Sequence, residues 1–280
     1  MRIHVFLLAV ALTLAVRAQE FAPVALTVRQ GETLHVTSSS AAKTARFKNR
    51  VIRLFPQANR QSLGLMPVAV ETPPGDYHLE LLGENGTVVQ DCPVTVIDGG
   101  FPVQDVHLSP RVARLRPSPG EMQTVAAFRN RVSELRYWTE PLALPTSGCM
   151  ISAFGVKRLY NGNDSGNFHG GIDQRAAART PIRAAAAGVV RIARRYNIHG
   201  GTVAIDHGQG LATIYLHLSR FAVRNGAVVR RGQIVGYAGS TGRSTAPHLH
   251  WSIYVNGVAV NPAQWVTLEA CPARTPPVGQ

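Results

Sequence analysis

The segment PHLHWSIYV, residues 247–255, places two histidines two positions apart at the start of a run of β-branched and aromatic residues. Such a run favours a β-strand, in which alternate side chains point to the same face. His248 and His250 are therefore expected to project from one side of the strand, with Leu249 on the other. Two converging imidazoles suggest a metal site. The pair alone leaves open whether both, one or neither is a ligand.

The sequence before this strand is rich in glycine and in short β-prone runs. From about residue 141, runs such as GVVRIARR (188–195) and GQIVGYAGS (232–240) lie between glycine turns. The pattern predicts a C-terminal antiparallel β domain over residues 141–271. The remaining residues, 272–280, have the composition of a disordered tail.

The N-terminal part, residues 19–100, also has a β pattern. The run DYHLELLGENGTVVQDCPVTVI (76–97) predicts a hairpin that turns at Glu84-Asn85-Gly86. Several short strands with regular turns predict a β-sandwich-like accessory domain, so the chain as a whole is expected to be mainly β.

Residues 101–140 interrupt the β pattern. The segment RLRPSPG (114–120) breaks the chain, and apolar residues then recur at helical spacing. They predict a linker with a helix and are Val125, Phe128, Val132 and Leu135.

Residues 1–18 have the features of a signal peptide. Arg2 supplies a positive charge, an apolar run follows, and Val16-Arg17-Ala18 fits a cleavage site. The alternative is an uncleaved membrane anchor. Cleavage predicts a periplasmic or extracellular protein without a membrane anchor. Export permits disulfides, and Cys149 and Cys271, which bracket the C-terminal domain, are the favoured pair, with Cys92 left free.

The net charge of +13 favours acidic partners. For an exported protein these are acidic cell-wall polymers and anionic lipids. A solvated basic surface would give the same composition. No stripe of interleaved aromatic and basic residues indicates nucleic-acid binding.

A second histidine motif, FHGGID, places His169 and Asp173 four residues apart. The paired glycines between them disfavour a helix, so a loop around an ion is expected. One histidine from HLH completes two imidazoles and one carboxylate, a set typical of catalytic zinc with an open fourth position. His217 in IYLHL is a candidate general base, and strand alternation predicts Tyr215 on the same face. His199 and His207 are interpreted as loop residues.

Four motifs in this order resemble the lysostaphin/LytM-type zinc endopeptidases, which cut peptide bridges in peptidoglycan. They are HGGID, YLHL, GQIVGYAGSTGRSTAPHLHW and VNGVAVNP, and the resemblance covers roughly residues 145–267. It implies a duplicated hybrid motif-like β domain with a narrow groove for an extended peptide. It also implies one zinc per chain, bound by His169, Asp173 and His250. By the same resemblance His217 and His248 are catalytic, and Tyr215 steadies the tetrahedral intermediate.

The resemblance predicts an exported zinc metalloendopeptidase that hydrolyses peptide cross-links of bacterial peptidoglycan. The alternative is a non-hydrolytic wall-binding activator of another hydrolase, and an adhesin is a third possibility. Ser252 departs from the usual glutamate, which bears on fine positioning at the site. The bond that is cut, the division of base and oxyanion roles between His217 and His248, and any covering of the groove by residues 101–140 stay open.

Overall fold

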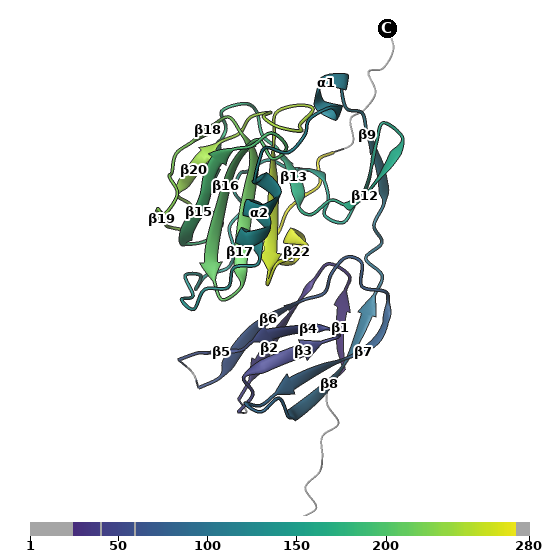
Figure 1. Cartoon of the computed structure of the whole chain (residues 1–280), viewed down its shortest axis with the longest axis vertical. Helices are drawn as coiled ribbons and strands as arrows, with labels where there is room; N and C mark the ends of the chain where they lie inside the picture. The colour runs from purple at the N-terminus through teal and green to yellow at the C-terminus, as the bar shows by residue number, and fades with distance from the viewer. Residues whose placement is uncertain (1–24, 40, 59, 273–280) are drawn as a thin grey trace, which may run out of the picture.

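The computed structural model describes residues 25–39, 41–58 and 60–272 (Figure 1). The predicted signal peptide and nearly all of the predicted tail lie outside these residues. Within the described ranges, no helix is long and apolar enough to cross a membrane. The mainly β fold is confirmed, because strands make up most of the regular structure.

The N-terminal unit consists of two facing sheets. Its strands are β1 (Leu26–Arg29), β2 (Thr33–Ser38), β3 (Thr44–Phe47), β4 (Arg50–Arg53), β5 (Phe55–Pro56), β6 (Ser62–Pro67), β7 (Gly75–Leu82) and β8 (Val88–Ile97). One sheet has the order β1-β8-β7-β3-β4, and the other has the order β2-β6-β5. Inward side chains of both sheets, such as Ala45, Met66 and Val94, form one core. The predicted hairpin is present as β7–β8, and Gly86 supplies the positive φ, 73°, that its turn requires.

The connecting segment contains β9 (Val103–Val106), α1 (Pro110–Ala113) and α2 (Glu121–Arg129). Val125 and Phe128 of α2 are buried against the C-terminal sheet. The prediction that Val132 and Leu135 continue this apolar face is wrong, because the helix ends at Arg129 and their exposed fractions are 41% and 66%.

The backbone after α2 bonds to a turn of the C-terminal sheet instead of to itself. The Gln209 N–H donates to the Ser133 carbonyl at 2.8 Å, and the Tyr137 N–H donates to the His207 carbonyl at 2.9 Å. Gly208 lies in the same turn with φ of 90°, and a Cβ there would lie 1.7 Å from the Leu135 carbonyl oxygen. These contacts take the place of further helical turns, so the segment after α2 packs against the C-terminal sheet as well as connecting α2 to it.

The C-terminal unit is built around an eight-stranded sheet. Its elements are β10 (Met150–Ser152), β11 (Lys157–Tyr160), β12 (Asn163–Phe168), β13 (Ile172–Arg175), β14 (Pro181–Arg183), β15 (Gly188–Arg195), β16 (Gly201–Gly208), β17 (Leu211–Leu218), β18 (Arg220–Phe221), β19 (Val228–Val229), β20 (Ile234–Tyr237), β21 (His248–Val255), β22 (Val258–Val260) and η1 (Pro262–Gln264). The main order is β10-β13-β21-β17-β16-β15-β19, with β22 on β21. Two small sheets, β12-β11-β9 and β14-β20-β18, flank it.

The two faces of the main sheet have different roles. One face packs into the largest core, which includes Tyr215, Leu249 and Trp251. The other face carries Ile214, Leu216 and Tyr254 and is covered in part by α2, which crosses it in Figure 1. Alternation along β21 therefore puts His248 and His250 on the α2 face, opposite Leu249.

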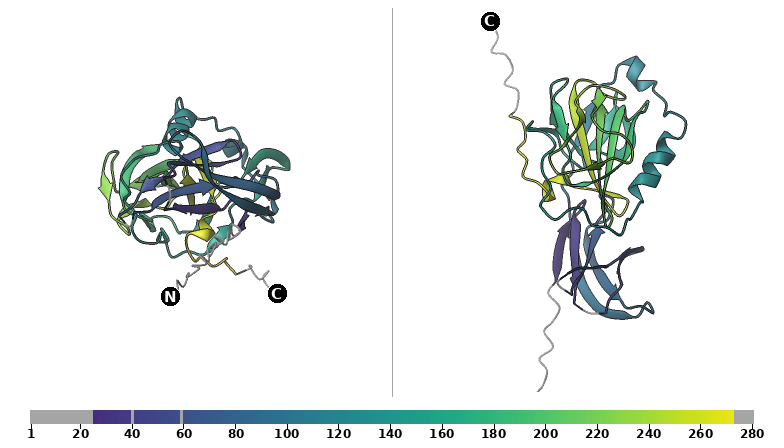
Figure 2. Two further views of the ribbon diagram at one scale, coloured as in Figure 1. Left: turned by 90° about the horizontal axis from the view of Figure 1, so that it is seen from below. Right: turned by 90° about the vertical axis from the view of Figure 1, so that its left-hand side faces the viewer.

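The two units lie end to end along the long axis of the molecule (Figure 2). Asn256 joins them, because its side-chain amide donates to the Leu65 carbonyl at 2.6 Å and its own carbonyl accepts from Arg50 at 3.0 Å. The predicted disulfide is confirmed: Cys149 and Cys271 are bonded, and Cys92 is free. This bridge ties the chain just before β10 to the chain beyond η1.

Candidate metal centre and active site

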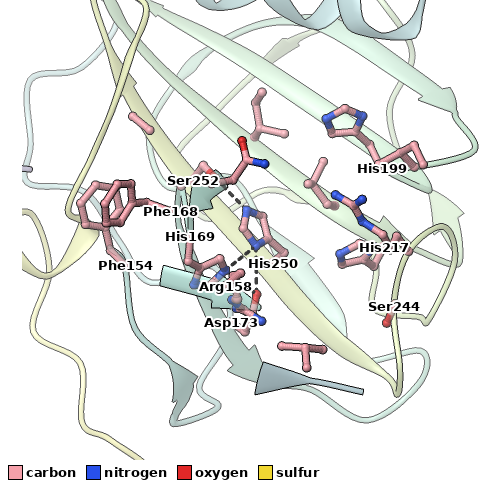
Figure 3. Close-up of a pocket in the computed structure, with 18 of the residues that line it drawn as sticks. Phe154, Arg158, Phe168, His169, Asp173, His199, His217, Ser244, His250 and Ser252 are labelled. Atoms are coloured by element: carbon pink, nitrogen blue, oxygen red, sulfur yellow. Dashed lines mark hydrogen bonds and ion pairs between the residues drawn. The ribbon is translucent and has the colours of Figure 1, made fainter. Parts of the chain in front are cut away.

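Strand pairing brings the histidine and aspartate motifs together. β13 lies antiparallel to β21, with Asp173 opposite His250. His169 lies in the loop between β12 and β13, which turns its ring back over Asp173, as Figure 3 shows. The glycines after His169 allow this turn, and a Cβ at Gly171 would lie 2.4 Å from the Trp251 carbonyl oxygen. The expected loop is therefore present, and no helix forms there.

Three ligand atoms converge at this point. His169 Nε2 lies 3.1 Å from Asp173 Oδ1 and 3.0 Å from His250 Nδ1, and the last two atoms are 2.9 Å apart. This is the only group of three or more potential metal ligands within the described part of the chain. The donor set of two imidazoles and one carboxylate is that of a catalytic zinc site.

Each of the three side chains is fixed by a partner behind it. His169 Nδ1 donates to the Ala153 carbonyl at 2.6 Å, which leaves Nε2 free for a metal. His250 Nε2 lies 2.8 Å from Ser252 Oγ, so Nδ1 faces the site. Arg158 donates to Asp173 Oδ2 at 2.9 Å, and Oδ1 remains the converging atom.

The protonation states also suit a metal. Burial alone would raise the pKa of Asp173, but His169 and His250 lower it well below its usual value. Burial lowers the pKa of His250 to about 4, although Asp173 opposes this shift. At neutral pH the carboxylate is ionised and the imidazole is neutral, which are the forms that bind zinc. The residues present therefore fit the metal.

His217 reaches this site through a β-bulge. Along β17 and β21, Leu216 is opposite His250, so Leu216 is on the site face. Simple alternation would turn His217 to the other face. Between Tyr215 and Leu218, however, two residues of β17 lie opposite one residue of β16, and His217 has a left-handed φ of 63°. The extra residue turns His217 to the site face and returns Leu218 to the core.

His217 and His248 flank the candidate ligands. His217 Nδ1 donates to the Thr241 carbonyl at 2.8 Å, and His248 Nδ1 donates to the Ala246 carbonyl at 2.8 Å. Each ring therefore keeps Nε2 free, and His248 Nε2 lies 3.7 Å from Asp173 Oδ1. Their ring centroids are 4.9 Å apart. Burial, with the charges of His248 and His250, lowers the pKa of His217 to about 3, so its ring is neutral near pH 7.

The prediction that Tyr215 shares a face with His217 is wrong. Tyr215 is fully buried in the core on the other side of the sheet. Its hydroxyl accepts from the Ala185 N–H at 2.8 Å and lies 3.1 Å from Thr213 Oγ1. The bulge explains the error, because period-two alternation does not extend across it. A phenol in this position has no access to a substrate.

A cavity of about 600 Å³ contains the site (Figure 3). Parts of the chain far apart in sequence line it: Val70 of the N-terminal unit, Met122 of α2, and Ala259 of β22. Arg129 and Arg243 also line it, and within the described residues neither guanidinium has a carboxylate partner. The cavity is therefore an open basic groove around the converging ligands.

The profile of Peptidase family M23 matches residues 167–262, which hold all three candidate ligands and both flanking histidines. This segment is therefore a domain of Peptidase family M23. The DD-carboxypeptidase/endopeptidase Mpg of Neisseria meningitidis serogroup B is 48% identical over 94 residues, 34% of this chain and 22% of that protein. The peptidoglycan DD-endopeptidase ShyC of Vibrio cholerae is 41% identical over 111 residues, 40% of this chain and 26% of that protein. The chain thus matches about a quarter of the length of these curated relatives.

A solved structure extends the likeness beyond the M23 segment. The crystal structure of a putative peptidase M23 from Pseudomonas aeruginosa covers 84% of this chain and 93% of its own, with a TM-score of 0.65 and 26% identity. The N-terminal sandwich and the M23 domain thus occur together in another member of the family.

Two residues beside the site, Arg158 and Glu121, were missed in the sequence. Arg158 supports Asp173, and Ser252, which the sequence marked as a departure from the usual glutamate, supports His250. Glu121 of α2 contacts the loop of His199, a histidine that the sequence led us to interpret as an ordinary loop residue. Only Ser252 had a signal, its two-residue spacing from His250 on a strand; Arg158 and Glu121 reach the site through tertiary contacts.

Proposed function

We propose that this chain is an exported zinc endopeptidase that hydrolyses peptide cross-links of bacterial peptidoglycan. The observation that carries the proposal is the convergence of His169, Asp173 and His250 beneath two histidines with free Nε2 atoms, inside an M23 domain. The names of the two relatives above, a DD-carboxypeptidase/endopeptidase and a peptidoglycan DD-endopeptidase, favour DD-endopeptidase activity.

His169, Asp173 and His250 would hold one zinc ion per chain. Zinc in such a set supplies a Lewis acid and lowers the pKa of water towards ~7. Arg158 and Ser252 keep the ligands oriented, which supports affinity and geometry.

The two flanking histidines would do the proton chemistry. Neutral Nε2 of His217 or His248 accepts the proton of the attacking water and passes it to the leaving amine. In the protonated form, the same atom donates a hydrogen bond to the oxygen that gains negative charge. Both rings are held at Nδ1 by backbone carbonyls, so either can serve without a change of position.

The groove would bind an extended peptide across the α2 face of the sheet. The guanidiniums of Arg129 and Arg243, which have no carboxylate partner in the described part of the chain, favour a substrate that carries carboxylates. The net charge of +13 favours acidic wall polymers near it. The N-terminal sandwich, β1 to β8, serves as an accessory domain, and the segment that carries β9 and α2 forms part of the groove wall.

A digest of defined peptidoglycan with mass analysis of the fragments tests the proposal. The zinc-loaded chain should contain about one zinc and release new amino termini, and His250→Ala should lose both properties. Zinc-loaded wild type that releases nothing from any wall type would favour the alternative, a wall-binding activator of another hydrolase.

A further inference from the structure

The buried carboxylate of Glu121 binds one loop beside the site. Its exposed fraction is 0%, although it lies at the first turn of α2. It accepts from the N–H groups of Ser118 at 2.7 Å, Ile198 at 3.0 Å and His199 at 2.9 Å. Burial would raise its pKa, but these bonds and the His199 ring lower it to about 2. Glu121 is therefore an ionised acceptor with donors on all sides.

Glu121 fixes the orientation of the His199 ring. Glu121 Oε1 lies 2.6 Å from His199 Nδ1, so this nitrogen carries the hydrogen and donates it. Nε2 is the remaining nitrogen, and it has no hydrogen-bond partner among the described residues. The side chain is 18% exposed and lines the cavity with Met122 and His217. In Figure 3, His199 lies on the same side of the pocket as His217.

The loop of His199 is joined to His217. The His217 N–H donates to the His199 carbonyl at 3.1 Å, and Arg243 N–H donates to the Ile198 carbonyl at 2.9 Å. A Cβ at Gly200 would lie 2.3 Å from the Thr241 carbonyl oxygen, the same oxygen that accepts from His217 Nδ1. His199 and His217 are thus held in one rigid frame.

An imidazole with a carboxylate behind one nitrogen and a free second nitrogen is the arrangement that orients functional histidines. We propose that His199 is a substrate-binding residue of the groove, and that Glu121 is the residue that positions it. Nε2 of His199 would hydrogen-bond the peptide chain of the substrate on the His217 side of the cleaved bond. The inference rests on the proposed function, but Glu121 lies outside residues 167–262, the segment that the family profile matches.

The deciding variant is His199→Ala in the zinc-loaded full chain. Loss of one hydrogen bond, about 0.5–1.5 kcal/mol net, corresponds to a rise in KM of about two- to twelvefold for a soluble cross-linked peptidoglycan fragment. The values of kcat and zinc content should stay as in wild type, because His199 does not contact the candidate ligands. Gln123→Ala, which changes an exposed side chain of α2 that does not line the cavity, is the matched control and should leave KM unchanged.

Glu121→Gln tests the positioning role. The new side-chain amide would place its own N–H hydrogens against the N–H donors that face Glu121. The His199 ring would then lose its acceptor, and KM should rise as in His199→Ala. In the double variant, KM should equal that of His199→Ala alone, because Glu121 acts through the ring. A further rise in the double variant would overturn the positioning role, and His199→Ala remains informative if Glu121→Gln does not fold.

Calorimetric binding of the same fragment to the zinc-depleted chain separates the two proposals. If the chain turns over the fragment and KM is the same in wild type and His199→Ala, the binding role of His199 is refuted and the proposed function stands. No turnover, with a dissociation constant that still weakens in His199→Ala, refutes the proposed function alone and supports the binding role.

Discussion

Tyr215→Phe discriminates between two roles for this phenol. The resemblance to zinc endopeptidases implied that Tyr215 stabilises the transition state, whereas the structure buries its hydroxyl against the Ala185 N–H and Thr213 Oγ1. The substitution leaves the N–H of Ala185 without its acceptor in a dry core, which costs about 1–3 kcal/mol of unfolding free energy. A donor to the oxyanion would instead contribute about 10²–10³ in kcat.

The assay combines urea unfolding with the rate of fragment release for the zinc-loaded chain. We expect the unfolding free energy to fall by about 1–3 kcal/mol while kcat stays within about twofold of wild type. Tyr254→Phe is the control, because Tyr254 lines the cavity and its hydroxyl has no partner in the described residues. It should change stability by no more than about 0.5 kcal/mol. A hundredfold loss of kcat in Tyr215→Phe with unchanged stability would refute the structural role.

Three further predictions concern the disulfide, the metal and pH. Cys271→Ser removes the disulfide that closes a loop of 122 residues, so the free energy of unfolding should fall by up to about 5 kcal/mol. The unfolding curve of the variant should match that of reduced wild type, and a curve that matches oxidised wild type would contradict the prediction. Ser252→Ala removes the partner of His250 and should weaken zinc affinity about 10- to 100-fold in a chelator competition, which an unchanged affinity would exclude. Burial lowers the pKa of His207 to about 4, so the unfolded chain takes up a proton first as pH falls from about 6.5. Stability present above that pH should decline by about 2–3 kcal/mol by pH 4.5, and His207→Gln, which cannot titrate, should remove that part of the decline in urea unfolding.

Local patterns predicted the features that depend on neighbouring residues. The hairpin of β7 and β8, the strand that carries His248 and His250, and the loop after His169 follow from alternation, turn residues and paired glycines. The convergence of His169, Asp173 and His250 required the family resemblance as well, because only strand pairing brings β13 beside β21.

Long-range contacts set the features that the sequence did not predict. The helical pattern after Phe128 is continuous in sequence, but α2 ends where Ser133 and Tyr137 bond to the turn at Gly208. Ser118, Glu121 and the loop of His199 are similarly separated by about eighty residues in sequence and joined only by the fold. No local periodicity reports such partners.

The bulge at His217 shows why the error at Tyr215 concerns function as well as structure. In the segment Tyr215-Leu216-His217-Leu218, simple alternation would put Tyr215 and His217 on one face and both leucines on the other. The extra residue instead allows Tyr215 and Leu218 to fill the core while Leu216 and His217 face the groove. The core therefore keeps its two large side chains, and the site gains a histidine whose ring is fixed by Thr241. His217 adopts a left-handed conformation that β-branched residues avoid, so Val at this position would disturb the bulge itself, whereas Asn tolerates the backbone and tests the imidazole alone.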